Sequence, residues 1–139
     1  MSGGRAAEEW GRVAVALPGW RWMARMYARV PLGSGATTWV SVTAVEGEWL
    51  HHSGDRRTLA SRCYPQVGDP ATAGCLLAML GPGWTIQALY DRHGVIVTKG
   101  AAYRAKYETG AGKHFYTGAT LGRACIAAAE ALGRWPGGE

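Results

Sequence analysis

A run of alternating basic and apolar residues near the start of the chain offers the clearest binding chemistry in the sequence. From Trp20 to Val30 every even position is apolar, and the odd positions carry most of the polar side chains. Successive side chains on a strand point to opposite faces, so a strand here would have one apolar and one cationic face. Cations beside an aromatic ring suit an anionic, planar ligand. The candidate ligand-binding residues of this segment are Arg21, Arg25, Tyr27 and Arg29.

A second basic segment lies in the C-terminal half of the chain, around a predicted strand at residues 103–107. Its two tyrosines fall on one strand face and its two cations on the other. The hypothesis is that both segments join in one basic surface lined by aromatic rings. The candidate ligand-binding residues of the second segment are Lys99, Arg104, Lys106 and Lys113. The tryptophans on the apolar sides of predicted strands are interpreted as core residues: Trp20, Trp22, Trp39 and Trp84.

Motifs for catalysis or metal binding give no comparable signal. Residues 110–113 resemble the end of a phosphate-binding P-loop, but Tyr107 stands where the motif needs glycine and His114 where it needs Ser or Thr. On a strand, the adjacent His51 and His52 would point to opposite faces and would not easily share one metal ion. The sequence therefore predicts a protein without catalytic residues, metal site or cofactor.

Local signals predict an α+β fold. Asp69 and Pro70 are typical of a helix start, and Gly81-Pro82-Gly83 of a helix end. The element order α-βββ-α-ββββ-α predicts a single domain over residues 1–139, with an antiparallel β-sheet and about three helices mainly on one face. Predicted helices cover 5–17, 70–80 and 120–132; predicted strands cover 20–30, 37–45, 49–52, 84–90, 94–99, 103–108 and 114–116. Residues 53–68 are predicted to be irregular, and residues 1–4 and 134–139 flexible.

Composition narrows the class of protein. The 139 residues are 47% hydrophobic and 18% charged, which is typical of a globular domain. No apolar run approaches the roughly 20 residues that cross a bilayer, and no signal peptide is recognisable. The odd number of cysteines (Cys63, Cys75 and Cys125) does not suggest a disulfide scaffold. A cytoplasmic location is expected, and the net charge of +5 favours an anionic partner.

The chain carries the segments LPGWRWM at Leu17–Met23 and DPATAGCLLAML at Asp69–Leu80, and an alanine-rich segment at Thr120–Leu132. The first two resemble segments of a group of small proteins encoded by phages and prophages, and the third resembles the final helix of that group. Ala24-Arg25 departs from the Pro-Gly that the group often has here. The resemblance implies a phage accessory protein in the bacterial host cytoplasm and implies no catalytic residues.

Such proteins often antagonise host defence, and several mechanisms compete. The main hypothesis is a non-enzymatic sponge, a protein that sequesters an anionic nucleotide-like ligand without changing it. Such a protein is expected to act as a homo-oligomer and to have no membrane partner. The alternative is a direct inhibitor that binds a host defence protein, such as a CRISPR effector. A nucleic-acid-binding regulator is a third class, although no recognition-helix motif is present. An enzyme that cleaves the signal would need a catalytic group that the sequence does not reveal.

Overall fold

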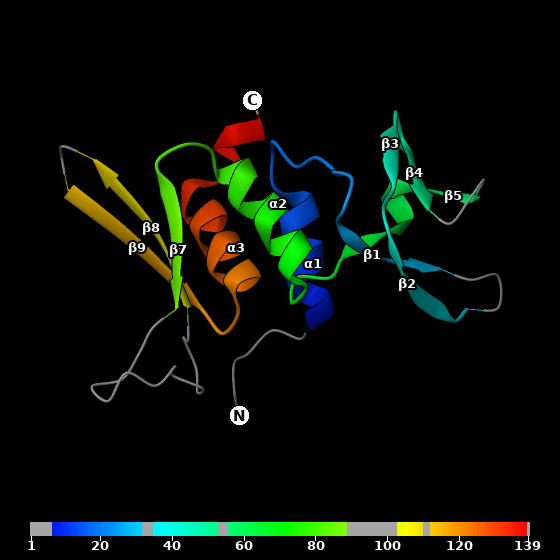
Figure 1. The fold of residues 1–139 in the computed structure, drawn as a ribbon, viewed down its shortest axis with the longest axis horizontal. Coiled ribbons are helices and arrows are strands. Elements are labelled where there is room, and N and C mark those ends of the chain that lie inside the picture. Colours follow the sequence, from blue (N-terminus) through cyan, green and yellow to red (C-terminus); the bar gives the residue numbers. More distant parts are fainter. Residues whose placement is uncertain (1–6, 32–34, 53–55, 89–102, 110–111, 139) are drawn as a thin grey trace.

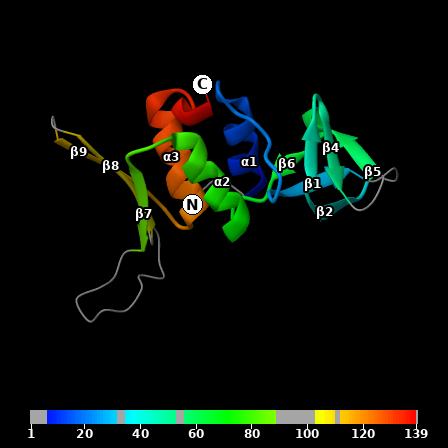
Figure 2. The same cartoon turned by 45° about the horizontal axis from the view of Figure 1, so that its top comes forward.

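Three helices lie between two groups of strands in the computed structural model of the chain (Figures 1 and 2). The helices are α1 (Ala7–Ala16), α2 (Pro70–Leu80) and α3 (Leu121–Leu132). The structure describes residues 7–31, 35–52, 56–88, 103–109 and 112–138; for 107–109 and 112–114 it describes the strands but not the side chains. None of the helices in these ranges is long and apolar enough to cross a membrane. The α+β class predicted from the sequence is confirmed.

The ends of the helices follow from local side-chain chemistry. The Asp69 carboxylate accepts a hydrogen bond from the backbone N–H of Thr72 (2.9 Å), and Pro70 occupies the first turn of α2. At α3, the Thr120 hydroxyl accepts from the backbone N–H of Arg123 (3.2 Å). Gly133 then ends α3 with a φ of 77°, a left-handed conformation that glycine adopts without strain. These local signals explain why α2 and α3 begin where the sequence predicts.

The N-terminal group of strands forms two small antiparallel sheets. The first sheet has the order β2-β1-β6, and the second has the order β3-β4-β5. A short 3₁₀ helix, η1 (Ala60–Arg62), leads from β5 to β6. The strands are β1 (Tyr27–Pro31), β2 (Thr37–Ser41), β3 (Ala44–Glu46), β4 (Trp49–His52), β5 (Arg56–Leu59) and β6 (Tyr64–Pro65). Residues 53–68, predicted to be irregular, therefore contain two strands in their described part.

The C-terminal group forms a third antiparallel sheet, with the order β7-β8-β9. Its strands are β7 (Trp84–Ala88), β8 (Tyr103–Thr109) and β9 (Gly112–Gly118). Helix α3 packs against all three strands. The sequence predicts a hairpin of residues 84–90 with 94–99, whereas the structure pairs β7 with β8. The predicted strand at 94–99 lies outside the described residues.

The prediction of one sheet with helices mainly on one face is thus corrected to three sheets with the helices between them. The chain changes sheet at Val42, which is only 1% exposed. Its backbone N–H donates to the carbonyl of Met26, and its carbonyl accepts from the N–H of Arg25 (both 2.8 Å). These bonds hold Val42 and Thr43 between β2 and β3, so the predicted strand at 37–45 divides in two.

The predicted strand at 20–30 is also shorter in the structure, because β1 starts only at Tyr27. A turn precedes it, in which Arg25 has a φ of 82°, a value that breaks an extended strand. Within β1 the predicted alternation is confirmed, since Ala28 and Val30 are buried and Arg29 lies on the other face. The turn therefore separates Arg21 and Arg25 from the strand that carries Tyr27 and Arg29.

The C-terminal segment differs from the prediction of a flexible tail. Trp135 is fully buried, and its indole Nε1–H donates to the carbonyl of Ala14 in α1 (3.0 Å). Its backbone N–H donates to the carbonyl of Pro18 (2.8 Å), and a short 3₁₀ helix, η2 (Pro136–Gly138), follows. Burying a large aromatic side chain stabilises a fold enough to hold the segment that carries it. Trp135 thus ties the end of the chain to α1.

Candidate ligand-binding site

A hollow of about 180 Å³ lies where the first turns of α1 and α3 meet strands β1, β2 and β6. Four segments far apart in the sequence contribute to its wall: α1, the β1–β2 hairpin, the chain from β6 to α2, and the start of α3. We call it the arginine–aromatic hollow. It is lined by Glu8, Arg29, Trp39, Tyr64, Pro65, Gln66, Val67, Gly68, Thr120 and Arg123.

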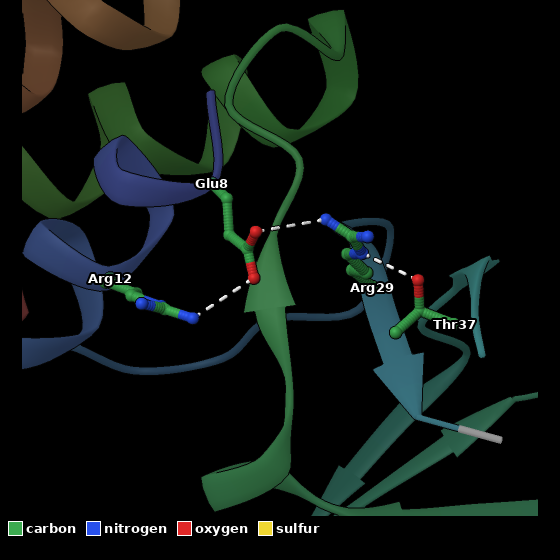
Figure 3. A network of polar contacts seen from close by, with 4 residues as sticks. All are labelled: Glu8, Arg12, Arg29 and Thr37. Carbon is green, nitrogen blue, oxygen red and sulfur yellow. Dashed lines mark hydrogen bonds and ion pairs between the residues drawn. The ribbon is translucent and has the colours of Figure 1, made fainter. Parts of the chain in front are cut away.

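Arg29 is the most constrained cation of the hollow. The alternation of β1 turns its side chain away from the core, toward α1 and β2. Its Nε–H donates to the Thr37 hydroxyl (2.8 Å), and its Nη1 lies 3.4 Å from a carboxylate oxygen of Glu8. Its guanidinium also lies 5.8 Å from the centre of the Trp39 ring. Figure 3 shows that these polar contacts join α1 to the β1–β2 hairpin through one arginine.

Arginine–aromatic pairing is repeated around the hollow. In each of three pairs a guanidinium lies over a ring, within the roughly 6 Å over which a cation and a ring attract each other. Arg12 with Tyr64 and Arg123 with Trp10 join elements far apart in the sequence, whereas Arg29 and Trp39 face each other across the β1–β2 hairpin. The pairs are Arg12 with Tyr64 (5.2 Å), Arg29 with Trp39 (5.8 Å) and Arg123 with Trp10 (5.6 Å).

Among the described residues that line the hollow, Glu8 is the one that carries a carboxylate. It lies in the first turn of α1, where the helix dipole favours an acidic side chain. Its carboxylate lies 3.2 Å from Arg12, one turn later in the helix, and 3.4 Å from Arg29 on β1 (Figure 3). Two arginines contact this carboxylate, and Arg123 also lines the hollow. The described side chains therefore leave an excess of positive charge at the hollow.

The prediction that Trp39 is a core residue is wrong, because Trp39 is 39% exposed. Its ring stacks on that of Tyr27 across the β1–β2 pair, with centroids 6.2 Å apart and 10° between the planes. Val40 and Val42 lie on the opposite, more buried side of the strand. The alternation of valines could have placed Trp39 on the open face. The core assignment of Trp84 is confirmed, and Trp20 and Trp22 are half-buried against the core.

The chain was compared with protein-family models, curated proteins and solved structures. None of them matches.

The structure divides the predicted binding residues instead of joining them in one surface. Arg29 lines the hollow and Tyr27 stacks on Trp39 beside it. Arg21 and Arg25 are exposed in the segment before β1. Arg104 and Lys106 lie on β8, in the sheet on the other side of the helices (Figures 1 and 2). Lys99 and the side chain of Lys113 fall outside what the structure describes. Two separate cationic regions replace the single predicted surface, because the three helices lie between β1 and β8.

The functional residues that sequence reasoning missed come from other elements: Arg12, Tyr64 and Arg123. Arg12 stands on the exposed face of α1, Tyr64 on a two-residue strand and Arg123 in the first turn of α3. No local pattern distinguishes them from ordinary surface residues. Only the packing of α1, β6 and α3 brings them to one place.

The three cysteines offer little reactivity. Burial raises the pKa of Cys63 to about 11 and that of Cys125 to about 12, and it also raises the pKa of Cys75. These thiols are therefore protonated near neutral pH, and a protonated thiol is a poor nucleophile and a poor metal ligand. Cys63 and Cys125 are buried as well. In the ranges that the structure describes, no three His, Cys, Asp or Glu side chains gather as metal ligands.

The hollow thus provides the chemistry of binding. Guanidinium groups can donate paired hydrogen bonds to a phosphate or carboxylate, and indole and phenol rings can stack on a planar group. The Glu8 carboxylate occupies the place between two arginines that an incoming anion would take. The volume of the hollow, about 180 Å³, is below the roughly 300–1,000 Å³ of a pocket that encloses a drug-sized ligand. The hollow therefore fits one part of such a ligand.

Proposed function

We propose that the protein is a non-enzymatic binder of an anionic, nucleotide-like ligand, and that the arginine–aromatic hollow is its binding site. The observation that carries the proposal is the set of three arginine–aromatic pairs around one hollow. Phosphate needs the cations and a base needs the rings, so both halves of a nucleotide find a partner within the same lining.

The ligand phosphate takes the place of the Glu8 carboxylate between Arg12 and Arg29. Glu8 is partly exposed, with 41% of its side chain accessible, so it can turn toward solvent when an anion arrives. The base stacks beside Trp39, whose ring is already fixed by Tyr27 on one side. Because the hollow fits only part of such a ligand, a second copy of the chain completes the enclosure, as in a symmetric homo-oligomer.

The biological role that goes with this binding is counter-defence. A phage accessory protein that holds a nucleotide signal in the host cytoplasm would keep it from a defence effector without any chemical step. This part of the proposal rests on the resemblance of the Leu17–Met23 and Asp69–Leu80 segments to phage-encoded proteins. The hollow supports it only by fitting the chemistry of such a signal.

Isothermal titration with cyclic mononucleotides, cyclic dinucleotides and ADP-ribose tests the proposal, with inorganic phosphate as the baseline. We expect at least one nucleotide to bind more tightly than phosphate. Arg29→Gln should weaken that binding about tenfold or more, since a hydrogen bond to a charged group contributes about 1.5–3 kcal/mol. Arg56→Gln is the matched control, because it removes an exposed arginine from β5 and should change the affinity less than about twofold.

Native mass spectrometry of the same samples separates the alternatives. Unmodified nucleotide recovered after denaturation, from an oligomer, supports the sponge. Turnover of the nucleotide would indicate an enzyme instead. No binding by any nucleotide, together with co-purification of one host defence protein, would reject the proposal in favour of a direct inhibitor.

A further inference from the structure

The face of the β7–β9 sheet that is turned away from α3 carries a regular array of side chains. Strand register pairs Thr85 with Lys106 and Lys106 with Phe115 in one row. A second row pairs Gln87 with Arg104 and Arg104 with Thr117. Ala105, between the two cations, is fully buried, which fixes the opposite orientation for the cations. The face consists of Thr85, Gln87, Arg104, Lys106, Phe115 and Thr117.

Arg104 and Phe115 form the centre of this face. The guanidinium of Arg104 lies 4.7 Å from the centre of the Phe115 ring, and its Nε–H donates to the side-chain oxygen of Gln87 (2.8 Å). The ring of Phe115 is 45% exposed, although phenylalanine has no polar group that would favour exposure. Phe115 is also the single phenylalanine of the chain. An exposed ring beside a guanidinium presents a stacking surface and a cation to a partner at the same place.

The charge of the face differs from that of the hollow. The neutral groups of Gln87 and Phe115 hold Arg104, whereas a carboxylate faces Arg29 in the hollow. Lys106 adds a second cation in the neighbouring row. Among the side chains of β7–β9 that the structure describes, none is acidic. The described part of this face therefore matches a polyanion in charge and an unpaired base in its ring.

We propose that this face binds single-stranded nucleic acid. Arg104 and Lys106 contact backbone phosphates, and a base stacks on Phe115, as on other β-sheet surfaces with exposed aromatic rings. Thr85, Gln87 and Thr117 add groups that hydrogen-bond to phosphate, sugar or base edges. A duplex is the poorer partner, because its bases are stacked inside and cannot reach the ring. The face is independent of the hollow, so either proposal can fail while the other stands.

Fluorescence anisotropy with labelled 20-nucleotide strands tests this inference, using oligo-dT and oligo-U, a duplex of the same length and poly-glutamate as competitor. We expect the single strands to bind, the duplex to bind more weakly, and the affinity to fall as salt rises. Phe115→Ala should weaken binding about fivefold or more, because it removes a stacking platform. The double variant Arg104→Gln/Lys106→Gln should weaken it further and reduce the slope of affinity against salt.

The matched control is Arg56→Gln/Arg62→Gln, which removes the same charge from exposed positions on β5 and η1. Circular dichroism and thermal unfolding confirm that each variant is folded before binding is measured. If both double variants lose the same affinity, binding depends on net charge alone and the proposal is wrong. Equal affinity for duplex and single strand, an unchanged affinity in Phe115→Ala, displacement by poly-glutamate at equal charge, or no binding at all would each overturn it.

Discussion

The two cationic regions of this protein use the same residue types in opposite geometries. At the arginine–aromatic hollow the surface is concave, because helices and strands meet there. Its positive charge is partly compensated, because Glu8 lies beside Arg29. At the β7–β9 face, strands alone present Arg104 beside an exposed ring. Their difference shows that an alternating basic strand does not define a site. What lies opposite the strand decides whether it becomes the wall of a hollow or an open platform.

The largest expected effect concerns the tryptophans of the two regions. Trp84 on β7 is only 9% exposed and packs near Tyr116 with centroids 5.9 Å apart, whereas Trp39 on β2 is 39% exposed. We expect Trp84→Ala to lower the free energy of unfolding by about 3–5 kcal/mol, because it leaves a large cavity in the core. Trp39→Ala should lower it by about 1 kcal/mol or less and should instead weaken nucleotide binding.

Urea unfolding followed by circular dichroism measures both values. The comparison between the regions breaks if Trp39→Ala destabilises the protein as much as Trp84→Ala does. Trp39 would then be a structural residue, and the hollow would lose its stacking surface.

An intermediate effect is expected from a glycine that shapes the hollow. A Cβ on Gly122 of α3 would collide with the backbone oxygen and side chain of Val67, which lines the hollow. Gly122→Ala should therefore lower the free energy of unfolding by about 1–3 kcal/mol and weaken nucleotide binding, since Val67 must move. Gly74→Ala in α2 is the control: nothing lies within 4 Å of its Cβ, and it should stabilise the helix by about 0.5–1 kcal/mol.

Thermal and urea unfolding of these two variants give the stabilities, and titration of the nucleotide gives the affinity. Equal stability changes in the two variants would mean that α3 does not need close contact with Val67. The distinction between a hollow built by helix packing and an open sheet face would then be lost.

The parts of the fold that the sequence predicts well are those with local causes. Asp69, Pro70 and Gly81 mark α2 by capping chemistry that acts within a few residues, and Thr120 and Gly133 do the same for α3. The prediction of β1 was too long because alternation continues through Trp22 and Ala24, whereas the turn at Arg25 depends on backbone bonds to Val42. Such a bond joins residues far apart in the sequence, and no local pattern reveals it.

The hollow was accessible to sequence reasoning only in part. Tyr27 and Arg29 stood out because both lie in one alternating segment. Tyr64 and Arg123 reach the hollow only because β6 packs against β1 and α3 packs against α1. The pairing of β7 with β8 had a similar cause, since contact with α3 and the register of the sheet select the partner strand. Chemistry carried by one segment could be predicted, and chemistry assembled by packing could not.

The smallest expected effect is a dependence of stability on pH that arises on the N-terminal side of the molecule. His52 on β4 is buried and its Nε2 lies 2.9 Å from the Thr58 hydroxyl. Burial, with the nearby charges of Arg56 and His51, lowers the pKa of His52 below its usual value of 6.5. The unfolded chain therefore binds a proton more readily than the folded one. The contribution of neutral His52 to the free energy of unfolding is therefore complete above about pH 6.5, and it is lost as the pH falls from there through the folded-state pKa.

Urea unfolding between pH 5 and pH 7.5 should show a shallow fall in stability on the acidic side, and His52→Gln should flatten that fall. Because His52 belongs to β4, next to the sheet that carries Arg29, mild acid should affect nucleotide binding before nucleic-acid binding at the β7–β9 face. If the fall disappears in His51→Gln and persists in His52→Gln, a different group causes it. If instead both binding activities decline together, the two regions unfold as one cooperative unit, and their independence holds only for ligand contacts and not for stability.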